Sequence, residues 1–454
     1  SSVSRYCLSY LMPILLGDWS VIIVTPSATQ QYLLEQDIPL LQQWLGTNKK
    51  VRIGDRWEEQ DQLMLTSPDH WLRDRLEHLE RFPTNIPIII DRADDLEEWA
   101  RQILSISITA KDWSELLNSV PHFSELIRNT RVKLTKSIFA RPENPYSNYR
   151  LLDSELKILS YLCELLNSKK LLTPKFSLFW QQLSQKSIIS WISRDRSLGL
   201  FTIHLAPADV GTKLQPIWHQ QPVVIIGSFL DIEASAPIYR QQLGLDLEML
   251  SLKFTPNRQN EHIQLYLPDR FPLPNTPNFQ SALIKQVLLL VSLSSGINQL
   301  VVIIVDDIPL QGQVGSALAA EAGSRVQVEQ TEIVNNNVLI CGWSFWKIHQ
   351  EELPVPGLLI IATLPLPSLE NPLVANRVAY HKRQRQDWFR LYLLPTALKT
   401  LEQAVVPLRE SQGIVALLDN RVNFRSYGKT ILSTLEPCAR INYIDPTWFG
   451  YPNS

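Results

Sequence analysis

Short apolar runs recur along the chain and alternate with amphipathic stretches. Each run has three to five residues, is rich in β-branched side chains and lacks the polar alternation of a half-exposed strand. Such runs are typical of strands that are buried on both faces of a parallel sheet. They are Val21–Val24, Ile88–Ile90, Val223–Ile226, Val301–Val305, Val338–Cys341, Leu358–Ala362 and Ile414–Leu418.

Between these runs, apolar residues return with helical spacing. One such set is Tyr32, Leu33, Leu40, Leu41, Trp44 and Leu45. Alternation of strands and helices indicates the α/β class with doubly wound parallel sheets. Region 96–199 differs, because it has helical spacing and few strand candidates, and we expect a helical insertion there. The proline-rich stretch Leu267–Pro277 predicts a connector between two α/β domains.

Length and charge narrow the classes of partner. A chain of 454 residues has room for two or three domains with large cores. Its formal net charge of −2 gives no global attraction to polyanions, so any nucleic-acid binding must come from local basic patches. The chain begins at Ser1 without a methionine, and we expect upstream residues to be missing.

The four cysteines, Cys7, Cys163, Cys341 and Cys438, never share a CxxC motif. This spacing favours reduced core thiols over metal or iron–sulfur ligands, and it predicts a cytoplasmic protein. The apolar run 287–305 is interrupted by serine, glycine, asparagine and glutamine, so we expect no membrane span.

Residues 338–372 read VLICGWSFWKIHQEELPVPGLLIIATLPLPSLENP. The frame SFW, PG, LP and NP within this stretch resembles the second motor domain of DinG/XPD-type superfamily 2 DNA helicases. In that family an acidic-glycine-Val-Asp stretch follows SFW and senses the nucleotide. Here Lys347, Ile348, His349 and Gln350 stand in its place.

Further segments match the family in order. LSYLMP and VIIVTPSATQQYLLEQDIPLL resemble the helix after the phosphate loop and the motif that follows, IIIDRADDLEEW resembles the Walker B strand, and LEQAVVPLRES resembles the last helicase motif. The resemblance implies two RecA-like (P-loop NTPase-type) doubly wound parallel-sheet domains. Residues 1–95 with 200–250 would form the first, 96–199 a helical arch-like insertion, and 251–454 the second, helicase C-terminal domain.

The phosphate loop that the family implies is degenerate. Counted back from LSYLMP, Tyr6 holds the lysine position and Cys7 the Ser/Thr position, and Arg5 holds one of the glycine positions. A phosphate loop needs glycines so that backbone N–H groups close around phosphate, and it needs a lysine and a hydroxyl for the γ-phosphate and Mg²⁺. Arg5 could still meet an anion, but we expect no ATP binding in the usual cradle.

The Walker B string Asp-Glu-Ala-His of the family reads Asp91, Arg92, Ala93, Asp94 here. Asp91 is the residual metal-binding carboxylate. A guanidinium cannot act as a base at neutral pH, so Arg92 cannot replace the catalytic glutamate. We expect Arg92 to pair with Asp91 or Asp94 instead.

The last motif keeps Gln403, but Pro407 and Glu410 hold the arginine-finger positions. Arg409 is one residue off, which turns it about 100° around a helix. An arginine finger contributes on the order of 10³–10⁵ in rate. Hydrolysis by the family mechanism should therefore be negligible, and ATP with Mg²⁺ would be cofactors only if activity is retained. Gly46–Pro83 contains no cysteine, so no iron–sulfur cluster is expected.

Nucleic-acid binding is the capacity that remains. The stretch RVAYHKRQRQDWFRLY at 377–392 interleaves basic and aromatic residues, which suits single-stranded nucleic acid through phosphate neutralisation and base stacking. A solvated helix face followed by core aromatics explains the same pattern. With a basic patch at 128–136 and a threonine that the family implies at the DNA backbone, the candidates are Thr25, Arg128, Arg131, Arg377, Lys382, Arg383, Arg385, Trp388 and Arg390.

Three interpretations follow from these residues. The first is a helicase-like pseudoenzyme that binds single-stranded DNA, another nucleic acid or a protein partner. The second is an active ATP-dependent DNA helicase with atypical motifs. The third is a protein-interaction scaffold that binds neither ATP nor DNA.

Overall fold

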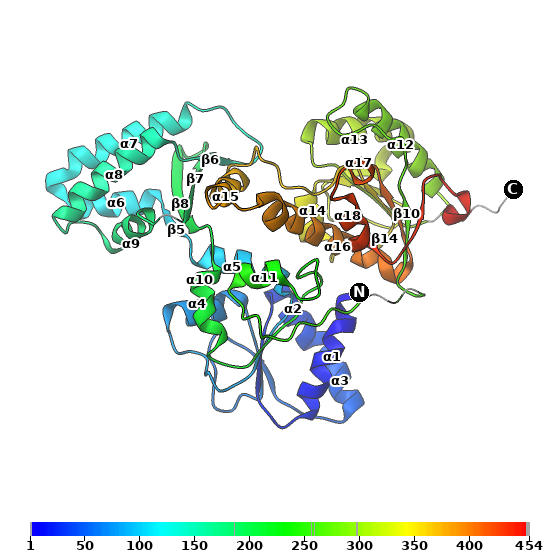
Figure 1. The fold of residues 1–454 in the computed structure, drawn as a ribbon, viewed down its shortest axis with the longest axis horizontal. Coiled ribbons are helices and arrows are strands. Elements are labelled where there is room, and N and C mark those ends of the chain that lie inside the picture. The colour runs from blue at the N-terminus through cyan, green and yellow to red at the C-terminus, as the bar shows by residue number, and fades with distance from the viewer. Residues whose placement is uncertain (1, 186, 256, 258, 297, 451–454) are drawn as a thin grey trace.

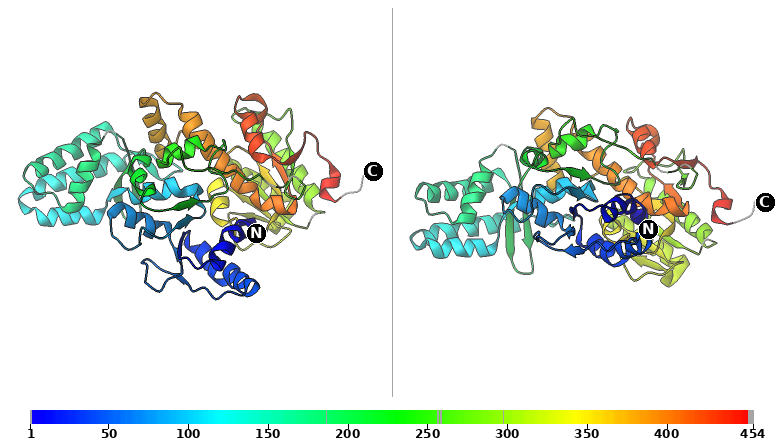
Figure 2. Two further views of the ribbon diagram at one scale, coloured as in Figure 1. Left: turned by 60° about the horizontal axis from the view of Figure 1, so that its bottom comes forward. Right: turned by 90° about the horizontal axis from the view of Figure 1, so that it is seen from below.

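The computed structural model describes residues 2–185, 187–255, 257, 259–296 and 298–450. Two parallel sheets and one antiparallel sheet divide the chain into two α/β domains and an insertion (Figure 1). The insertion lies at one end of the long axis, and the second domain lies at the other (Figure 2). The two parallel sheets confirm the predicted α/β class.

The first domain is built on a five-stranded parallel sheet with the order β2-β3-β1-β4-β9. Its elements are α1 (Ser2–Leu16), β1 (Val21–Val24), α2 (Ser27–Tyr32), η1 (Leu33–Asp37), α3 (Ile38–Leu45), β2 (Val51–Ile53), β3 (Leu63–Thr66), α4 (Pro68–Glu77), β4 (Ile88–Ile90), η2 (Ala93–Asp95), α5 (Leu96–Ile103), α10 (Gly211–Trp218), β9 (Val223–Ile225) and α11 (Pro237–Leu243). Successive residues of β1 serve opposite faces of the sheet. Val21 and Ile23 pack against α1 and α3, whereas Ile22 and Val24 pack against α4, α5, α10 and α11.

The insertion combines helices with a four-stranded antiparallel sheet in the order β5-β8-β7-β6. Its elements are β5 (Ile106–Ile108), α6 (Ala110–Ser119), η3 (Pro121–Phe123), α7 (Ser124–Phe139), β6 (Asn148–Arg150), α8 (Asp153–Ser168), α9 (Pro174–Leu183), β7 (Ile188–Asp195) and β8 (Leu200–Pro207). The sequence predicted a helical insertion with few strands at 96–199 and placed 200–207 in the first domain. In the structure, β8 pairs with β5 and β7 of the insertion.

The second domain carries a seven-stranded parallel sheet with the order β12-β13-β11-β14-β15-β10-β16. Its elements are β10 (Ile263–Tyr266), α12 (Phe279–Ser294), β11 (Leu300–Ile304), α13 (Ile308–Ala322), η4 (Gly323–Arg325), β12 (Val326–Val328), β13 (Val338–Cys341), α14 (Trp343–His349), β14 (Pro356–Ile361), α15 (Pro372–Arg383), η5 (Phe389–Leu393), α16 (Leu394–Ser411), β15 (Ile414–Leu417), α17 (Arg421–Phe424), α18 (Gly428–Leu435), β16 (Cys438–Ile441) and η6 (Pro446–Phe449). Helices α12 and α13 cover one face, and α14, α16 and α18 cover the other.

The position predicted for the connector between the domains was wrong. The strand β10 precedes the proline-rich stretch Leu267–Pro277 and already pairs with β15 and β16 of the second sheet. The connector therefore runs between α11 and β10, and the prolines shape a loop that leads from β10 to α12.

Helix α15 leaves the second domain and packs on the antiparallel sheet of the insertion (Figure 1). Tyr380 of α15 contacts the apolar cluster of Ile189, Ala206 and Ala208 on the sheet face that points away from α7 and α8. No helix among the described residues is long and apolar enough to cross a membrane.

Candidate nucleotide cleft and nucleic-acid surface

Asp91 directly follows β4 at the carboxyl edge of the first sheet, where α/β folds place ligands. Asp91 is 6% exposed, and its carboxylate is bound by protein groups. The Tyr10 hydroxyl donates to Asp91 Oδ2 at 2.9 Å, and the Arg92 backbone N–H donates to Oδ1 at 2.9 Å. The Cys7 thiol lies 3.9 Å from Oδ2. The residual Walker B carboxylate is thus enclosed by α1.

Burial governs the protonation of this cluster. Desolvation raises the pKa of Asp91, although the hydrogen bonds from Tyr10 and from the Arg92 backbone oppose that rise. Desolvation, together with the nearby Asp91 carboxylate, raises the pKa of Cys7 to about 12, so Cys7 is a neutral thiol at physiological pH. Burial also raises the pKa of Tyr10, which therefore remains a hydrogen-bond donor.

These residues do not fit Mg²⁺ and ATP. A phosphate loop presents a hydroxyl to the metal beside a solvated carboxylate, whereas here a neutral thiol and a phenol cover Asp91. Arg5 and Tyr6 lie in α1, but their side chains fall outside the described residues. Among the described residues, no group of three or more His, Cys, Asp and Glu side chains is placed to hold a metal ion.

The prediction that Arg92 pairs with Asp91 or Asp94 was wrong. Arg92 has a left-handed backbone with φ of 56°, and its guanidinium forms an ion pair with Glu351 of the second domain at 2.8 Å. Asp94 instead accepts hydrogen bonds from the backbone N–H groups of Ser228 and Phe229 at 3.1 and 2.7 Å. The left-handed turn directs the Arg92 side chain across the domain boundary.

Asp95 receives two lysines from the second domain. Lys347, which follows SFW in α14, lies 3.0 Å from Asp95 Oδ1, and Lys399 of α16 lies 2.8 Å from the same atom. Burial alone would raise the pKa of Asp95, but the ammonium groups of Lys399 and Lys347 overcome this effect and lower it. Lys347 therefore serves as a contact between the two α/β domains.

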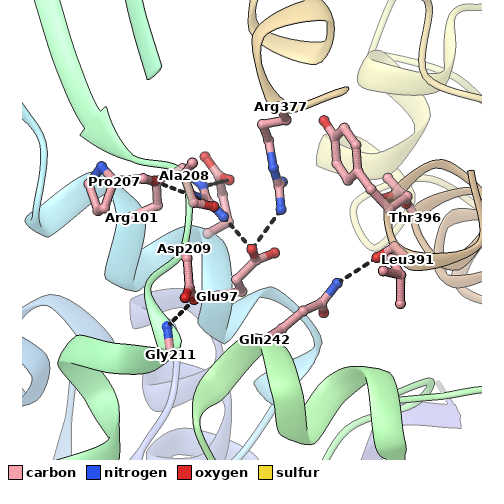
Figure 3. A network of polar contacts seen from close by, with 12 residues as sticks. Glu97, Arg101, Pro207, Ala208, Asp209, Gly211, Gln242, Arg377, Leu391 and Thr396 are labelled. Atoms are coloured by element: carbon pink, nitrogen blue, oxygen red, sulfur yellow. Dashed lines mark hydrogen bonds and ion pairs between the residues drawn. The ribbon is translucent and has the colours of Figure 1, made fainter. Parts of the chain in front are cut away.

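Glu97, two residues further on, forms the centre of a buried network (Figure 3). Arg377 of α15 lies 2.6 Å from Glu97 Oε1, and Arg101 binds the same oxygen. Arg101 also donates to the carbonyls of Pro207 and Ala208 at the exit of the insertion. The Arg377 guanidinium stacks 3.9 Å from the ring centroid of Tyr392. The network joins the first domain, the insertion and the second domain.

The sequence predicted Arg377 at the nucleic-acid surface, but the structure places this residue inside the Glu97 network. Its side chain is 12% exposed and is committed to Glu97. Burial would lower the pKa of Arg377, but the Glu97 carboxylate overcomes this effect and raises it. Arg377 is therefore a charged structural residue in this arrangement.

The residues of the last helicase motif also bind within the protein. Arg409 is 4% exposed and pairs with Glu402 at 3.0 Å, and its guanidinium donates to the Thr434 carbonyl at 3.2 Å. It therefore points into the packing between α16 and α18. Gln403 is half-buried on α16, one turn before Pro407, which lies inside the same helix.

The remaining nucleic-acid candidates fall into separate places. Thr25 is completely buried after β1, so a DNA strand cannot reach it in this arrangement. Arg128 is exposed and Arg131 is half-buried on α7, on the opposite side of the antiparallel sheet from α15. The structure does not bring these three residues to α15.

The C-terminal end of α15 and the residues after it carry the exposed basic candidates, which are Lys382, Arg383, Arg385 and Arg390. Lys382 Nζ lies 5.1 Å from the ring centroid of Trp388, which is half-buried. Arg390 lies 3.6 Å from Asp387. In the described part of the chain, neither Arg383 nor Arg385 forms an ion pair, so both present their charge to solvent.

Sequence reasoning missed the partners that enclose the cleft. Tyr10 stands three residues after Cys7, so both side chains share one face of a helix, and this spacing was a usable signal. Lys347 was noted only as a departure from the family motif. Nothing in the local sequence marks Glu351 or Lys399 as partners, because their contacts depend on how the two domains pack.

Comparison with known families and sequences points to helicases. The family described as Helicase C-terminal domain matches residues 357–438. The ATP-dependent DNA helicase YoaA of Haemophilus influenzae is 24% identical over 275 residues, which covers 57% of this chain and 43% of YoaA. YoaA of Escherichia coli strain K12 is 23% identical over 252 residues, which covers 53% of this chain and 40% of that protein. The matches thus span less than half the length of these relatives.

Solved structures agree in fold. Xpd4 of S. tokodaii superposes with a TM-score of 0.58 at 11% identity, over 96% of this chain and 94% of that one. A structure described as XPD helicase superposes with a TM-score of 0.52 at 12% identity, over 97% of this chain and 99% of that one. At such low identity the likeness concerns the fold alone.

Proposed function

Because this chain belongs to the DinG/XPD-type family of superfamily 2 helicases, we propose that it is a helicase homologue without ATPase activity that binds single-stranded nucleic acid. The binding surface in this proposal is the exposed basic end of α15. The cytoplasmic location predicted from the cysteines stays a prediction.

The contact between Tyr10 and Asp91 carries the first half of this proposal. In phosphoryl transfer the Walker B carboxylate holds Mg²⁺, which bridges the β- and γ-phosphates. Here the Asp91 carboxylate accepts a hydrogen bond from a buried phenol at 2.9 Å instead. Arg92 replaces the catalytic base and is bound to Glu351, and Arg409 is bound to Glu402. A metal ion that binds Asp91 through Oδ2 would have to displace the Tyr10 hydroxyl first.

Exposed charge beside an aromatic ring supports the second half. Arg383 and Arg385 face solvent, and Lys382 lies over the Trp388 ring. Arginines neutralise phosphates, and a neighbouring indole offers a surface on which a base can stack. Since the formal net charge is −2, binding that depends on this patch should weaken steeply as salt rises.

A second candidate function is protein interaction. The connector between α11 and β10 exposes four large apolar side chains, Leu247, Leu250, Leu252 and Phe254, with exposed fractions of 68–83%. Apolar side chains gathered on a surface mark sites of protein contact more often than sites of nucleic-acid contact.

Fluorescence anisotropy with a labelled single-stranded oligonucleotide separates the two candidates. The proposal predicts saturable binding. The logarithm of the binding constant should fall linearly with the logarithm of the salt concentration, with a slope of about −0.7 for each phosphate contact. It also predicts no phosphate release from ATP when that oligonucleotide is added. Absence of binding at low salt would leave protein interaction as the better account, and DNA-stimulated phosphate release would overturn the loss of ATPase activity.

A further inference from the structure

Every ionic side chain of the segment that leaves the Walker B strand, residues 92–97, is engaged, and three of them reach the second domain. Arg92 pairs with Glu351, Asp95 pairs with Lys347 and Lys399, and Glu97 pairs with Arg377. The Lys399 ammonium also donates to the Asp94 carbonyl at 3.1 Å. We propose that residues 92–97 form a latch that holds the two motor domains together without a nucleotide.

The partners of the latch residues come from separate elements of the second domain. The second domain contributes residues from three helices or their ends, since Lys347 and Glu351 come from α14 and the turn after it, Lys399 from α16, and Arg377 from α15. These contacts span the domain boundary along one continuous stretch of six residues. The segment therefore touches three elements of the second domain.

Burial distinguishes two pairs of the latch, Asp95 with Lys399 and Glu97 with Arg377, from ordinary surface ion pairs, whereas the side chains of Lys347 and Glu351 are 43% and 50% exposed. The side chains of Asp95 and Lys399 are 24% and 21% exposed, and those of Glu97 and Arg377 are 19% and 12% exposed. Exposed pairs such as Arg73 with Asp69, at 42% and 56%, contribute little because water and salt screen them. The partly desolvated pairs Asp95–Lys399 and Glu97–Arg377 are screened less than such exposed pairs and hold their partners more firmly.

The segment occupies the place where coupling to the nucleotide would begin. It starts directly after Asp91, the predicted metal-binding carboxylate. Within the segment, Asp94 accepts hydrogen bonds from the Ser228 and Phe229 backbone, which leads out of β9. The groups that would respond to a bound phosphate are thus fixed to the second domain or to the Ser228–Phe229 backbone. Domain closure in this chain then depends on ionic contacts and not on ATP.

A distance measurement between the two motor domains tests the latch. Gln43 on α3 and Ala320 on α13 are exposed positions away from the boundary. Gln43→Cys and Ala320→Cys, with Cys438→Ser to remove the half-buried thiol, accept a donor and an acceptor dye or two spin labels. The labelled full chain is examined without nucleic acid, so the outcome is independent of the proposed binding surface.

In the protein with an unmodified latch, the distance between the labels at positions 43 and 320 should have one narrow distribution at low salt. ATP with Mg²⁺ should leave this distribution unchanged. Asp95→Asn should shift it to longer, broader distances, whereas the matched control Asp69→Asn, which removes an exposed carboxylate of the first domain, should leave it unchanged. Raising the salt from 0.05 to 1 M should shift the unmodified chain in the same direction, because ion pairs at the boundary are screened.

A charge reversal keeps the test decisive if Asp95→Asn folds poorly. Arg92→Glu and Glu351→Arg should each broaden the distribution, and the double variant should restore it, because the pair is rebuilt in reverse. Circular dichroism and thermal unfolding verify that each variant is folded. An unchanged distance in folded Asp95→Asn and in both single reversals, or closure that appears only with ATP and Mg²⁺, would overturn the latch.

Discussion

The predicted nucleotide site around Asp91 and the end of α15 use the same kinds of side chain in opposite ways. In the cleft, carboxylates and cations bind one another across the domain boundary, and Asp91 is enclosed by Tyr10 and Cys7. At the end of α15, Arg383 and Arg385 present their charge to solvent. The difference teaches that a charged side chain is a candidate for ligand binding only where no group of the protein itself already forms an ion pair with it.

Among the predictions, replacement of Arg377 and of Arg383 by alanine should differ most in its effect on the free energy of unfolding. Arg377→Ala leaves Glu97 with less compensation in a buried site, and we expect it to lower the free energy of unfolding by about 3–5 kcal/mol. Arg383→Ala lies on the same helix and should change it by less than about 0.5 kcal/mol.

Urea unfolding followed by tryptophan fluorescence measures both variants under the same conditions. Equal costs for the two arginines would contradict the division into a committed and an exposed group.

The double substitution Arg383→Ala with Arg385→Ala addresses the exposed side of the comparison. It removes two cations from the proposed surface, and we expect affinity for single-stranded DNA to fall roughly tenfold, with a salt slope that is lower by about 1.4. Anisotropy titrations at several salt concentrations give both values.

Lys50→Ala with Arg56→Ala is the control, because it changes the net charge equally at exposed positions of the first domain. Equal losses in both double variants would mean that overall charge, and not the end of α15, determines binding.

Tyr10→Phe tests the enclosure of Asp91. The substitution removes one hydroxyl and leaves a buried carboxylate with one donor fewer, so we expect a loss of about 1–2 kcal/mol in stability. Thermal unfolding measures it, and binding to single-stranded DNA should be unaffected. A variant as stable as the parent would show that the hydroxyl is not needed at Asp91.

Asp91→Asn should have the smallest effect and the opposite sign. Burial raises the pKa of Asp91 above its unfolded value, so the folded state binds more protons in the window just above the ordinary carboxyl pKa of about 4. The contribution of Asp91 to the free energy of unfolding is therefore present at low pH, and it is lost as the pH rises through the raised pKa of this carboxyl group. The amide variant avoids this loss, and its Tm at pH 7 should be roughly 1–3 °C higher.

The advantage of Asp91→Asn should shrink as the pH is lowered toward about 4. Unfolding scans from pH 4 to pH 8 on both proteins measure this trend. A lower Tm for the amide at pH 7 would indicate that the charged carboxylate stabilises the fold.

The central strands of the parallel sheets were predictable because strands such as β1, β11 and β14 are buried on both faces. The strands β2, β3, β12 and β16 were not predicted. All seven apolar runs form strands, and Val21–Val24 and Val338–Cys341 coincide with β1 and β13. The antiparallel sheet of the insertion was missed because its strands are half-exposed and mix polar with apolar residues, as Ile188–Asp195 does. The strand β10 was missed for a similar reason, since Gln264 interrupts its apolar run.

The candidate site was predictable only in part. The buried strand Ile88–Ile90 before Asp91 was predicted correctly, and the motif roles assigned to Asp91 and its neighbours stay predictions. Arg377 and Arg383 could not be separated from the sequence, although they lie six residues apart and therefore roughly 240° around the helix. Which of those directions faces Glu97 and which faces solvent depends on the packing of α15 between two domains.

Titration of a fluorescent ATP analogue in the presence of Mg²⁺, followed by phosphate release with and without single-stranded DNA, tests the central claim most directly. The enclosed Asp91 and the paired Arg92 and Arg409 predict no saturable analogue binding and no release above background in either condition. Saturable binding with phosphate release that single-stranded DNA stimulates would contradict the account.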